Sequence, residues 1–131
     1  MERAEGTFEI TAMGEDTYAE IEGAGKLARA NGTQRFAGDI EGEGSVEWLM
    51  AYEAQGGARF LGLQRIEGSI AGRTGSLVME AIGDFDGERS KGTWTILPGS
   101  ATGALTGITG GGGFEASSGP NASYTLEYGL S

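Results

Sequence analysis

Apolar and polar side chains alternate with a period of two through most of this chain. Over Gly6–Met13, the apolar residues Phe8, Ile10 and Ala12 alternate with two threonines and a glutamate. This period is typical of a β-strand that buries one face. The longest stretch without glycine, Ser45–Gln55, has the same alternation, so we expect a strand there rather than a three-turn helix.

Eight or nine strands joined by short turns are expected from this pattern. The predicted strands are Gly6–Met13, Thr17–Ala30, Thr33–Glu43, Ser45–Gln55, Ala58–Ile70, Thr74–Phe85, Ser90–Leu97, Ala104–Ala116 and Ser123–Leu130. The predicted turns are Gly56-Gly57, Ala71-Gly72, Asp86-Gly87, Pro98-Gly99 and Ser118–Asn121, with a two-residue hairpin turn at Asn31-Gly32. Because glycine inside a strand often marks a bulge, we expect Thr17–Ala30 to be broken or bulged around Gly23 and Gly25.

Consecutive strands with short connections form an antiparallel meander, which loses its exposed edges when it closes into a barrel. We therefore predict an all-β fold, a small antiparallel up-and-down β-barrel of about eight strands. Its length suits one hydrophobic core, so residues 1–131 are expected to form a single domain.

An apolar-acid-glycine pattern recurs along the predicted strands. Its copies are Ile21-Glu22-Gly23, Ile40-Glu41-Gly42, Ile66-Glu67-Gly68 and Phe85-Asp86-Gly87. The uneven spacing argues against a solenoid. It suits equivalent positions on successive hairpins, where glycine permits a bulge or a sharp bend at a barrel corner. Coincidence in a chain rich in glycine and glutamate is the alternative.

Composition narrows the chemistry that such a barrel can perform. Glycine makes up 26 of the 131 residues, with 2 prolines and neither histidine nor cysteine. This excludes Ser-His-Asp and Cys-His nucleophile systems, His/Cys zinc sites, thiol redox chemistry and disulfides. Asp84–Glu88 begins like a calcium loop but lacks the glycine at the sixth position and the distant closing glutamate, so we expect a hairpin tip and no metal site.

Acidic residues outnumber basic ones, 19 Asp and Glu against 9 Lys and Arg, for a net charge of −10. Nucleic acid and anionic membrane surfaces attract clustered Lys and Arg, so we expect neither as a partner. No window approaches the roughly 18 consecutive apolar residues of a membrane-spanning helix. The first residues, Met1–Gly6, lack the pattern of a signal peptide, so we expect a cytoplasmic protein.

Six segments carry a resemblance to known proteins. They are GTFEI, GKLARA, FAGDIEGEGSVEWLMAY, ARFLGLQRIEGSIAGRTGSLVM, PGSATGALTGITGGGGF and YTLEYGL. They are similar to a family of small bacterial proteins of unassigned function, domain-of-unknown-function family 3224, whose fold resembles the allene oxide cyclase barrel. The resemblance runs over nearly the whole chain and implies the fold, whereas fold similarity alone does not transfer chemistry.

The same resemblance bears on cofactors. Enzymes with allene oxide cyclase-like barrels work without cofactors, through the shape of an apolar cavity and a carboxylate or bound water. We therefore expect no cofactor here. Their catalytic motif does not match this sequence residue by residue, so no catalytic assignment carries over.

A barrel of this size holds either packed side chains or one small ligand. The alternation places Trp48, Met50 and Tyr52 on an inward face, and Trp48 and Tyr52 are the best candidates for a cavity wall. Secondary candidates, each with one polar group, are Gln64, Trp94 and Tyr18. The alternative is that these residues are core side chains of a filled barrel.

Two stretches, Phe60–Leu63 and Leu77–Ile82, are apolar on both faces. In a single-layer barrel one of these faces is outside, where it forms an exposed apolar stripe. Such stripes usually mark interfaces. We therefore predict a homo-oligomer built through these strands.

Glu80 is the lone acidic residue in the second of these stretches. If it points inward, desolvation raises its pKa and makes it a candidate general acid or base. The alternative is that it pairs with Arg65 or Arg73, or faces solvent at an oligomer seam. The alternation does not decide which face of Leu77–Ile82 points inward.

Three functions are compatible with these features, and the sequence does not decide whether the protein is an enzyme. The favoured hypothesis is a barrel that binds a small apolar or amphipathic molecule. The first alternative is a cofactor-independent cyclase or isomerase that uses Glu80. The second is a structural barrel whose interior is packed solid.

Overall fold

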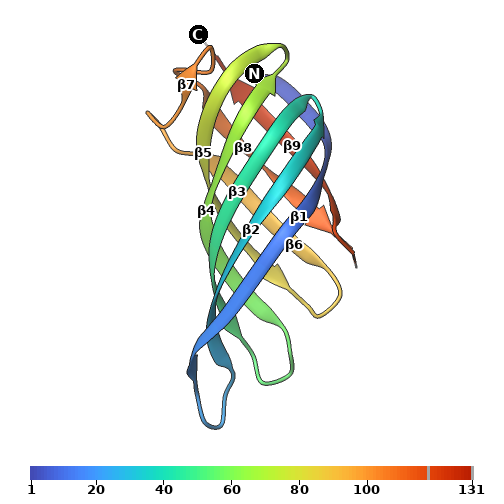
Figure 1. Cartoon of the computed structure of the whole chain (residues 1–131), viewed down its shortest axis with the longest axis vertical. Coiled ribbons are helices and arrows are strands. Elements are labelled where there is room, and N and C mark those ends of the chain that lie inside the picture. Colours follow the sequence, from blue (N-terminus) through green and yellow to red (C-terminus); the bar gives the residue numbers. More distant parts are fainter. Residues whose placement is uncertain (118, 131) are drawn as a thin grey trace.

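The computed structural model describes residues 1–117 and 119–130, which form strands, turns and loops (Figure 1). No helix occurs among these residues, and so none that is long and apolar enough to cross a membrane. The strands are β1 (Glu2–Glu20), β2 (Lys26–Gly38), β3 (Ile40–Tyr52), β4 (Ala58–Ile70), β5 (Arg73–Phe85), β6 (Ser90–Ile96), β7 (Thr102–Gly103), β8 (Thr109–Ala116) and β9 (Asn121–Gly129).

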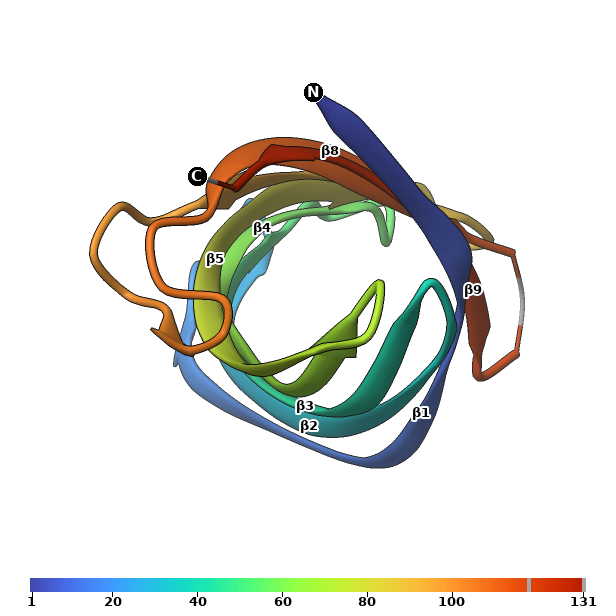
Figure 2. The ribbon, with the colours of Figure 1, turned by 90° about the horizontal axis from the view of Figure 1, so that it is seen from above.

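Eight of these strands close into an antiparallel barrel (Figure 2). Around the barrel the order is β1-β2-β3-β4-β5-β6-β8-β9, and β9 pairs with β1 to complete the circle, with Glu2 opposite Tyr128. The short β7 is an extra strand that pairs with β5. The predicted all-β barrel is therefore confirmed. β9 covers β1 only over Glu2–Glu9, and the rest of β1 pairs with β2 alone.

The first hairpin differs from the predicted one. Asn31-Gly32 is not a turn, because both residues lie within β2 and pair with β1 on one side and β3 on the other. The chain instead turns over residues 21–25, where Gly23 has a φ of +82°. The expected break around Gly23 and Gly25 is thus the connection between β1 and β2.

Two further boundaries differ from the prediction. The predicted strand Thr33–Glu43 is divided at Asp39, because Gly38 adopts a φ of +101° and the chain reverses there into β3. The predicted strand Ala104–Ala116 starts only at Thr109, because residues before it form turns that bury Leu105 and Ile108. Ser118 of the predicted turn Ser118–Asn121 lies outside the described residues.

A β-bulge in β1 changes which residues face the barrel interior. Phe8 is buried as predicted, but the register with β2 shifts between Ile10 and Ala12. The extra residue reverses the alternation. Ala12 therefore lies on the exposed outer face, contrary to the prediction, whereas Met13 and Glu15 follow on the inner face.

Glycines allow close approach of the backbones of two neighbouring strands. Gly42 of β3 and Gly68 of β4 lie directly opposite each other, and both belong to the recurring apolar-acid-glycine pattern. A Cβ on Gly68 would lie 2.7 Å from the Cα of Gly42, closer than real Cβ atoms come to a backbone atom. These two glycines lie within continuous strands, so the predicted role of the pattern at a bulge or a sharp bend stays a prediction.

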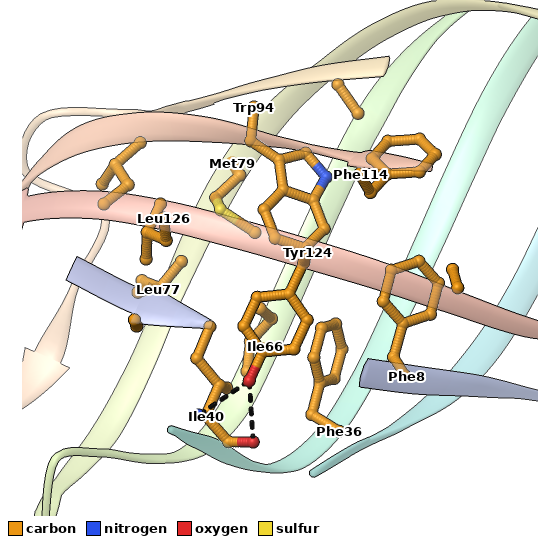
Figure 3. Close-up of a cluster of buried hydrophobic side chains, with 14 of the residues drawn as sticks. Phe8, Phe36, Ile40, Ile66, Leu77, Met79, Trp94, Phe114, Tyr124 and Leu126 are labelled. Carbon is orange, nitrogen blue, oxygen red and sulfur yellow. Dashed lines mark hydrogen bonds between the residues drawn. The ribbon is translucent and has the colours of Figure 1, made fainter. Parts of the chain in front are cut away.

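Aromatic rings fill the middle of the barrel (Figure 3). The Trp94 indole lies against the rings of Phe8, Phe36, Phe114 and Tyr124, with centroid separations from 5.6 to 6.2 Å. Aliphatic side chains continue this core toward the end of the barrel that holds the corner at Asp39. We call this the packed end.

Tyr124 ties the last strand to that corner. Its hydroxyl accepts a hydrogen bond of 2.9 Å from the Ile40 N–H and donates one of 3.0 Å to the Ala37 carbonyl. Burial raises the pKa of Tyr124 above its usual value, so the phenol remains a donor at neutral pH. The packed end is thereby fixed by side-chain hydrogen bonds as well as by the sheet.

Candidate binding cavity

The barrel interior is not filled at its other end, which we call the hairpin end. There residues 21–25, 53–57 and 86–89 connect successive strands. A cavity of about 210 Å³ lies inside it, lined by Phe8, Ile10, Met13, Glu15, Gln34, Trp48, Met50, Tyr52, Phe60, Gln64, Phe85, Ser90, Phe114 and Ala116. Met13 is 54% exposed and Glu15 is also exposed, so the cavity reaches solvent at this end.

Aromatic rings form the inner wall of this cavity. The Phe114 ring centroid lies 5.9 Å from that of Phe8 and 6.2 Å from that of Phe60. Trp48 meets Phe60 edge to face at 5.8 Å. These rings belong to the same aromatic cluster as Trp94, so the cluster is both the core of the barrel and the floor of the cavity.

The Trp48 indole is placed by the absence of a side chain on the neighbouring strand. Gly62 of β4 lies opposite Trp48, and a Cβ there would lie 2.7 Å from Trp48 Cδ1. In the part of the chain that the structure describes, the buried Nε1 of Trp48 has no hydrogen-bond partner. Trp48 thus contributes an apolar surface and one free donor.

Two glutamines form a buried polar pair among these apolar side chains. Gln34 and Gln64 are 2% and 1% exposed, and Gln64 Nε2 donates a hydrogen bond of 2.6 Å to Gln34 Oε1. Each amide carries two donor hydrogens and an acceptor oxygen, so this single bond leaves further hydrogen-bonding capacity on both side chains. Both residues line the cavity, and the pair gives the wall its polar part.

The mouth of the cavity carries a second polar pair. The Tyr52 hydroxyl donates a hydrogen bond of 2.8 Å to Glu15 Oε1, and the Lys26 Nζ lies 5.0 Å from the Tyr52 ring centroid. Burial, together with the hydrogen bond to Glu15 and its negative charge, raises the pKa of Tyr52 to about 12. The phenol therefore remains protonated and holds the carboxylate at neutral pH.

The structure brings four of the predicted residues together. Trp48, Met50, Tyr52 and Gln64 all line the cavity. Their strands are neighbours, and the inward alternation of β3 continues as expected through Tyr52. These four residues therefore lie in a cavity wall, as predicted. That they bind a ligand stays a prediction.

Two other candidates lie elsewhere. Trp94 is 2% exposed inside the aromatic cluster and does not line the cavity. Tyr18 is 57% exposed and sits at a second register shift of β1, between Thr17 and Ala19. The first bulge, after Ile10, already puts Met13 and Glu15 on the inner face, so Tyr18 falls outside the inward alternation.

Glu80 lies on the outer face of the barrel. Its neighbours Met79 and Ala81 are completely buried, whereas Glu80 is exposed and sits opposite Leu63 of β4. The predicted role of Glu80 as a general acid or base required that it point into the interior, and it does not. Glu80 faces solvent, which was the alternative interpretation.

Sequence reasoning missed Glu15 and Gln34. No pattern in the sequence marks the bulge that turns Glu15 inward. Gln34 had a usable signal, because it stands two residues before Phe36 on the face that was predicted to point inward. Gln34 was missed because only apolar residues were assigned to the inward face.

The exposed apolar stripe predicted from the two-faced strands is present. Leu61 and Leu63 of β4 are 52% and 55% exposed, and Leu49 of β3 lies directly opposite Leu61. Val78 and Ile82 of β5 continue the stripe on the same outer face and are half-buried. The oligomer expected from this stripe stays a prediction.

Comparison with known proteins places the chain within one family of barrels. The family model DUF3224, described as a protein of unknown function, matches residues 4–128. A crystal structure of a DUF3224 protein of unknown function from Shewanella oneidensis MR-1 superposes with a TM-score of 0.84 and 25% sequence identity, covering 100% of this chain and 98% of that one. No curated protein matches the sequence.

Proposed function

This chain belongs to the DUF3224 family, and from the geometry of its barrel we propose that it binds one small apolar or amphipathic molecule at the hairpin end. The observation that carries the proposal is the cavity inside the hairpin end of the barrel. Well-packed barrels of this size contain few voids larger than a water molecule. The cavity here has a volume of about 210 Å³ and opens to solvent beside Met13 and Glu15.

The volume sets the size of the ligand. An engineered apolar cavity of about 150 Å³ in another protein binds benzene. A cavity of about 210 Å³ therefore suits a molecule with one ring or a short branched chain and a few further atoms. The aromatic wall supplies apolar contact, and Gln34, Gln64 and the Trp48 indole supply the few polar groups that orient a ligand.

Binding is favoured over turnover by where the carboxylates lie. The cyclase or isomerase hypothesis needs a desolvated carboxylate within an apolar interior. Glu80 is outside the barrel, and Glu15 is exposed at the mouth of the cavity and hydrogen-bonded to Tyr52. A barrel packed solid is disfavoured by the cavity itself. We therefore place this protein among small-molecule-binding barrels.

The test is to fill the cavity and measure ligand binding. Toluene and benzyl alcohol are titrated while binding is followed by ligand-observed NMR and by the fluorescence of Trp48 in a Trp94→Phe background. Ala116 lines the cavity, so Ala116→Phe is expected to abolish binding. Ala51 is exposed on the outer face of β3, so Ala51→Phe adds the same side chain and is expected to leave binding unchanged.

Two results would overturn the proposal. One is the absence of binding for both compounds in the folded wild-type protein. The other is equal binding to the wild type and to folded Ala116→Phe, which would place the compounds outside the cavity.

A further inference from the structure

We infer that the natural ligand of this cavity is a small organic cation, with an ammonium group on an apolar body about the size of one ring. The inference rests on the proposed binding function and concerns the charge of the ligand. Its first support is the charge of the lining. Glu15 is the charged residue among those that line the cavity, and no Lys or Arg occurs in that described set.

The second support is the aromatic character of the wall. The aromatic residues that line the cavity are Phe8, Trp48, Tyr52, Phe60, Phe85 and Phe114. Aromatic faces attract cations through the ring quadrupole, and cages of such rings are a common way to bind quaternary ammonium groups. A carboxylate at the mouth of an aromatic cavity therefore matches a molecule with an apolar body and a cationic end.

The third support is an ammonium group that the protein itself places at the mouth. Lys26 Nζ lies 5.0 Å from the centroid of the Tyr52 ring, within the range of a cation–π contact. The hydroxyl of the same tyrosine holds Glu15 by a 2.8 Å hydrogen bond. The Tyr52 ring thus accommodates an ammonium group, although the charge of Lys26, which does not line the cavity, partly offsets that of Glu15.

The Tyr52 hydroxyl also fixes how Glu15 is presented. It donates to Oε1, which leaves Oε2 free to accept from a ligand N–H. A protonated phenol adds no negative charge of its own, so the mouth offers one oriented carboxylate. Charge-assisted hydrogen bonds of this kind are about twice as strong as neutral ones.

The charge of the whole chain acts in the same direction. With a net charge of −10, the molecule attracts cations and repels anions over distances of about one Debye length. A carboxylate or phosphate ligand would meet this repulsion, and Glu15 as well, without a lining Lys or Arg to offset it. We therefore expect the cavity to bind an ammonium ligand most tightly, a neutral ligand less tightly and a carboxylate ligand most weakly.

The experiment uses three probes that share one ring and differ in charge: benzylammonium, benzyl alcohol and benzoate. Their dissociation constants for the wild-type protein are measured by ligand-observed NMR at low salt. We expect benzylammonium to bind about threefold to tenfold more tightly than benzyl alcohol. Benzoate is expected to bind most weakly.

Two variants separate the local carboxylate from the overall charge. Glu15→Gln is expected to remove most of the preference for benzylammonium over benzyl alcohol. Glu9→Gln is the matched control, because Glu9 is exposed on the outer face of the same strand and its loss changes the net charge equally. This control is expected to keep the preference.

The outcomes distinguish the two proposals. If benzyl alcohol or benzoate binds as tightly as benzylammonium, the inference about charge is overturned while the binding function stands. The inference about charge is also overturned if Glu9→Gln lowers the preference as much as Glu15→Gln does. If none of the three probes binds to the folded protein, the binding function is overturned together with it.

Discussion

Tyr52 and Glu15 are joined by a 2.8 Å hydrogen bond although their strands, β3 and β1, are not neighbours in the barrel. The bond passes over β2 at the mouth of the cavity. It exists because the bulge of β1 turns Glu15 inward, toward the phenol. The barrel mouth is therefore held by a side-chain hydrogen bond between two strands that do not pair with each other in the sheet.

Ionisation of Tyr52 is expected to weaken the fold at high pH. Its pKa is raised from 10.0 to about 12, first by burial and then by its hydrogen bond to Glu15. A raised pKa in the folded state stabilises the protein fully below the unfolded value, and this contribution is lost as pH rises through about 12. The free energy of unfolding should therefore fall over that interval.

The measurement is urea unfolding as a function of pH, for the wild type and for Tyr52→Phe. The difference between the two proteins should shrink as the pH passes from 10.0 to about 12, because phenylalanine does not ionise. Tyr124 and Tyr128 also have raised pKa values but are present in both proteins. A difference that stays constant across this interval would contradict the prediction.

The Gln34–Gln64 pair is expected to behave as a unit. Gln64→Met removes the donor and leaves the buried Gln34 without its partner, which should destabilise the fold by about 1–3 kcal/mol. The double variant Gln34→Met/Gln64→Met removes both polar groups and should be less destabilised than the sum of the single variants. Urea unfolding measures all three, and strict additivity would show that the pair is not coupled.

A side chain at Gly62 is expected to displace the Trp48 indole. The Cβ of Gly62→Ala would clash with the Glu47 carbonyl oxygen and would lie 2.7 Å from Trp48 Cδ1, so the variant should lose about 1–3 kcal/mol and change the fluorescence of Trp48. Gly129→Ala is the control, because a Cβ there meets only Thr109 Oγ1, at 3.7 Å. Because the Glu47 backbone alone could account for a loss of stability, the deciding result is the fluorescence of Trp48, measured in a Trp94→Phe background. Unchanged fluorescence would show that Gly62 does not position the indole.

The outer stripe of Leu49, Leu61 and Leu63 is expected to mediate self-association. At micromolar concentration the sedimentation mass should exceed that of one chain of 13.5 kDa. Leu61→Lys/Leu63→Lys should restore the mass of one chain, whereas Thr7→Lys, on the exposed outer face of β1, should not. A wild-type mass of one chain would refute the prediction.

The alternation of apolar residues predicted most of the barrel because burial of one strand face depends on sequence period alone. It correctly placed Phe8 and Met50 in the interior, and β4 has the predicted bounds Ala58–Ile70. Where both faces are apolar, the period carries no information. That is why Glu80 had two possible orientations until the register of β4 and β5 was known.

The candidate site was harder to predict because it depends on local departures from regular strands. A single extra residue at the bulge after Ile10 decides that Glu15, and not Asp16, faces inward. The Asn31-Gly32 pair favours a turn locally, but pairing with both neighbouring strands outweighs that preference. The position of the bulge and the strand conformation of Asn31-Gly32 depend on pairing between strands that are distant in sequence. A short stretch of sequence therefore does not reveal them.

The pairing of β9 with β1 has a consequence for how the protein folds. Because Glu2 lies opposite Tyr128, the circle of strands closes only after almost the whole chain is available. Contacts between residues so distant in sequence carry a large loop-closure cost and are typical of slow folding, in milliseconds to seconds. Until β9 pairs with β1, the edges of both strands can pair with other chains. The pairing of β9 therefore reduces the risk of aggregation during folding.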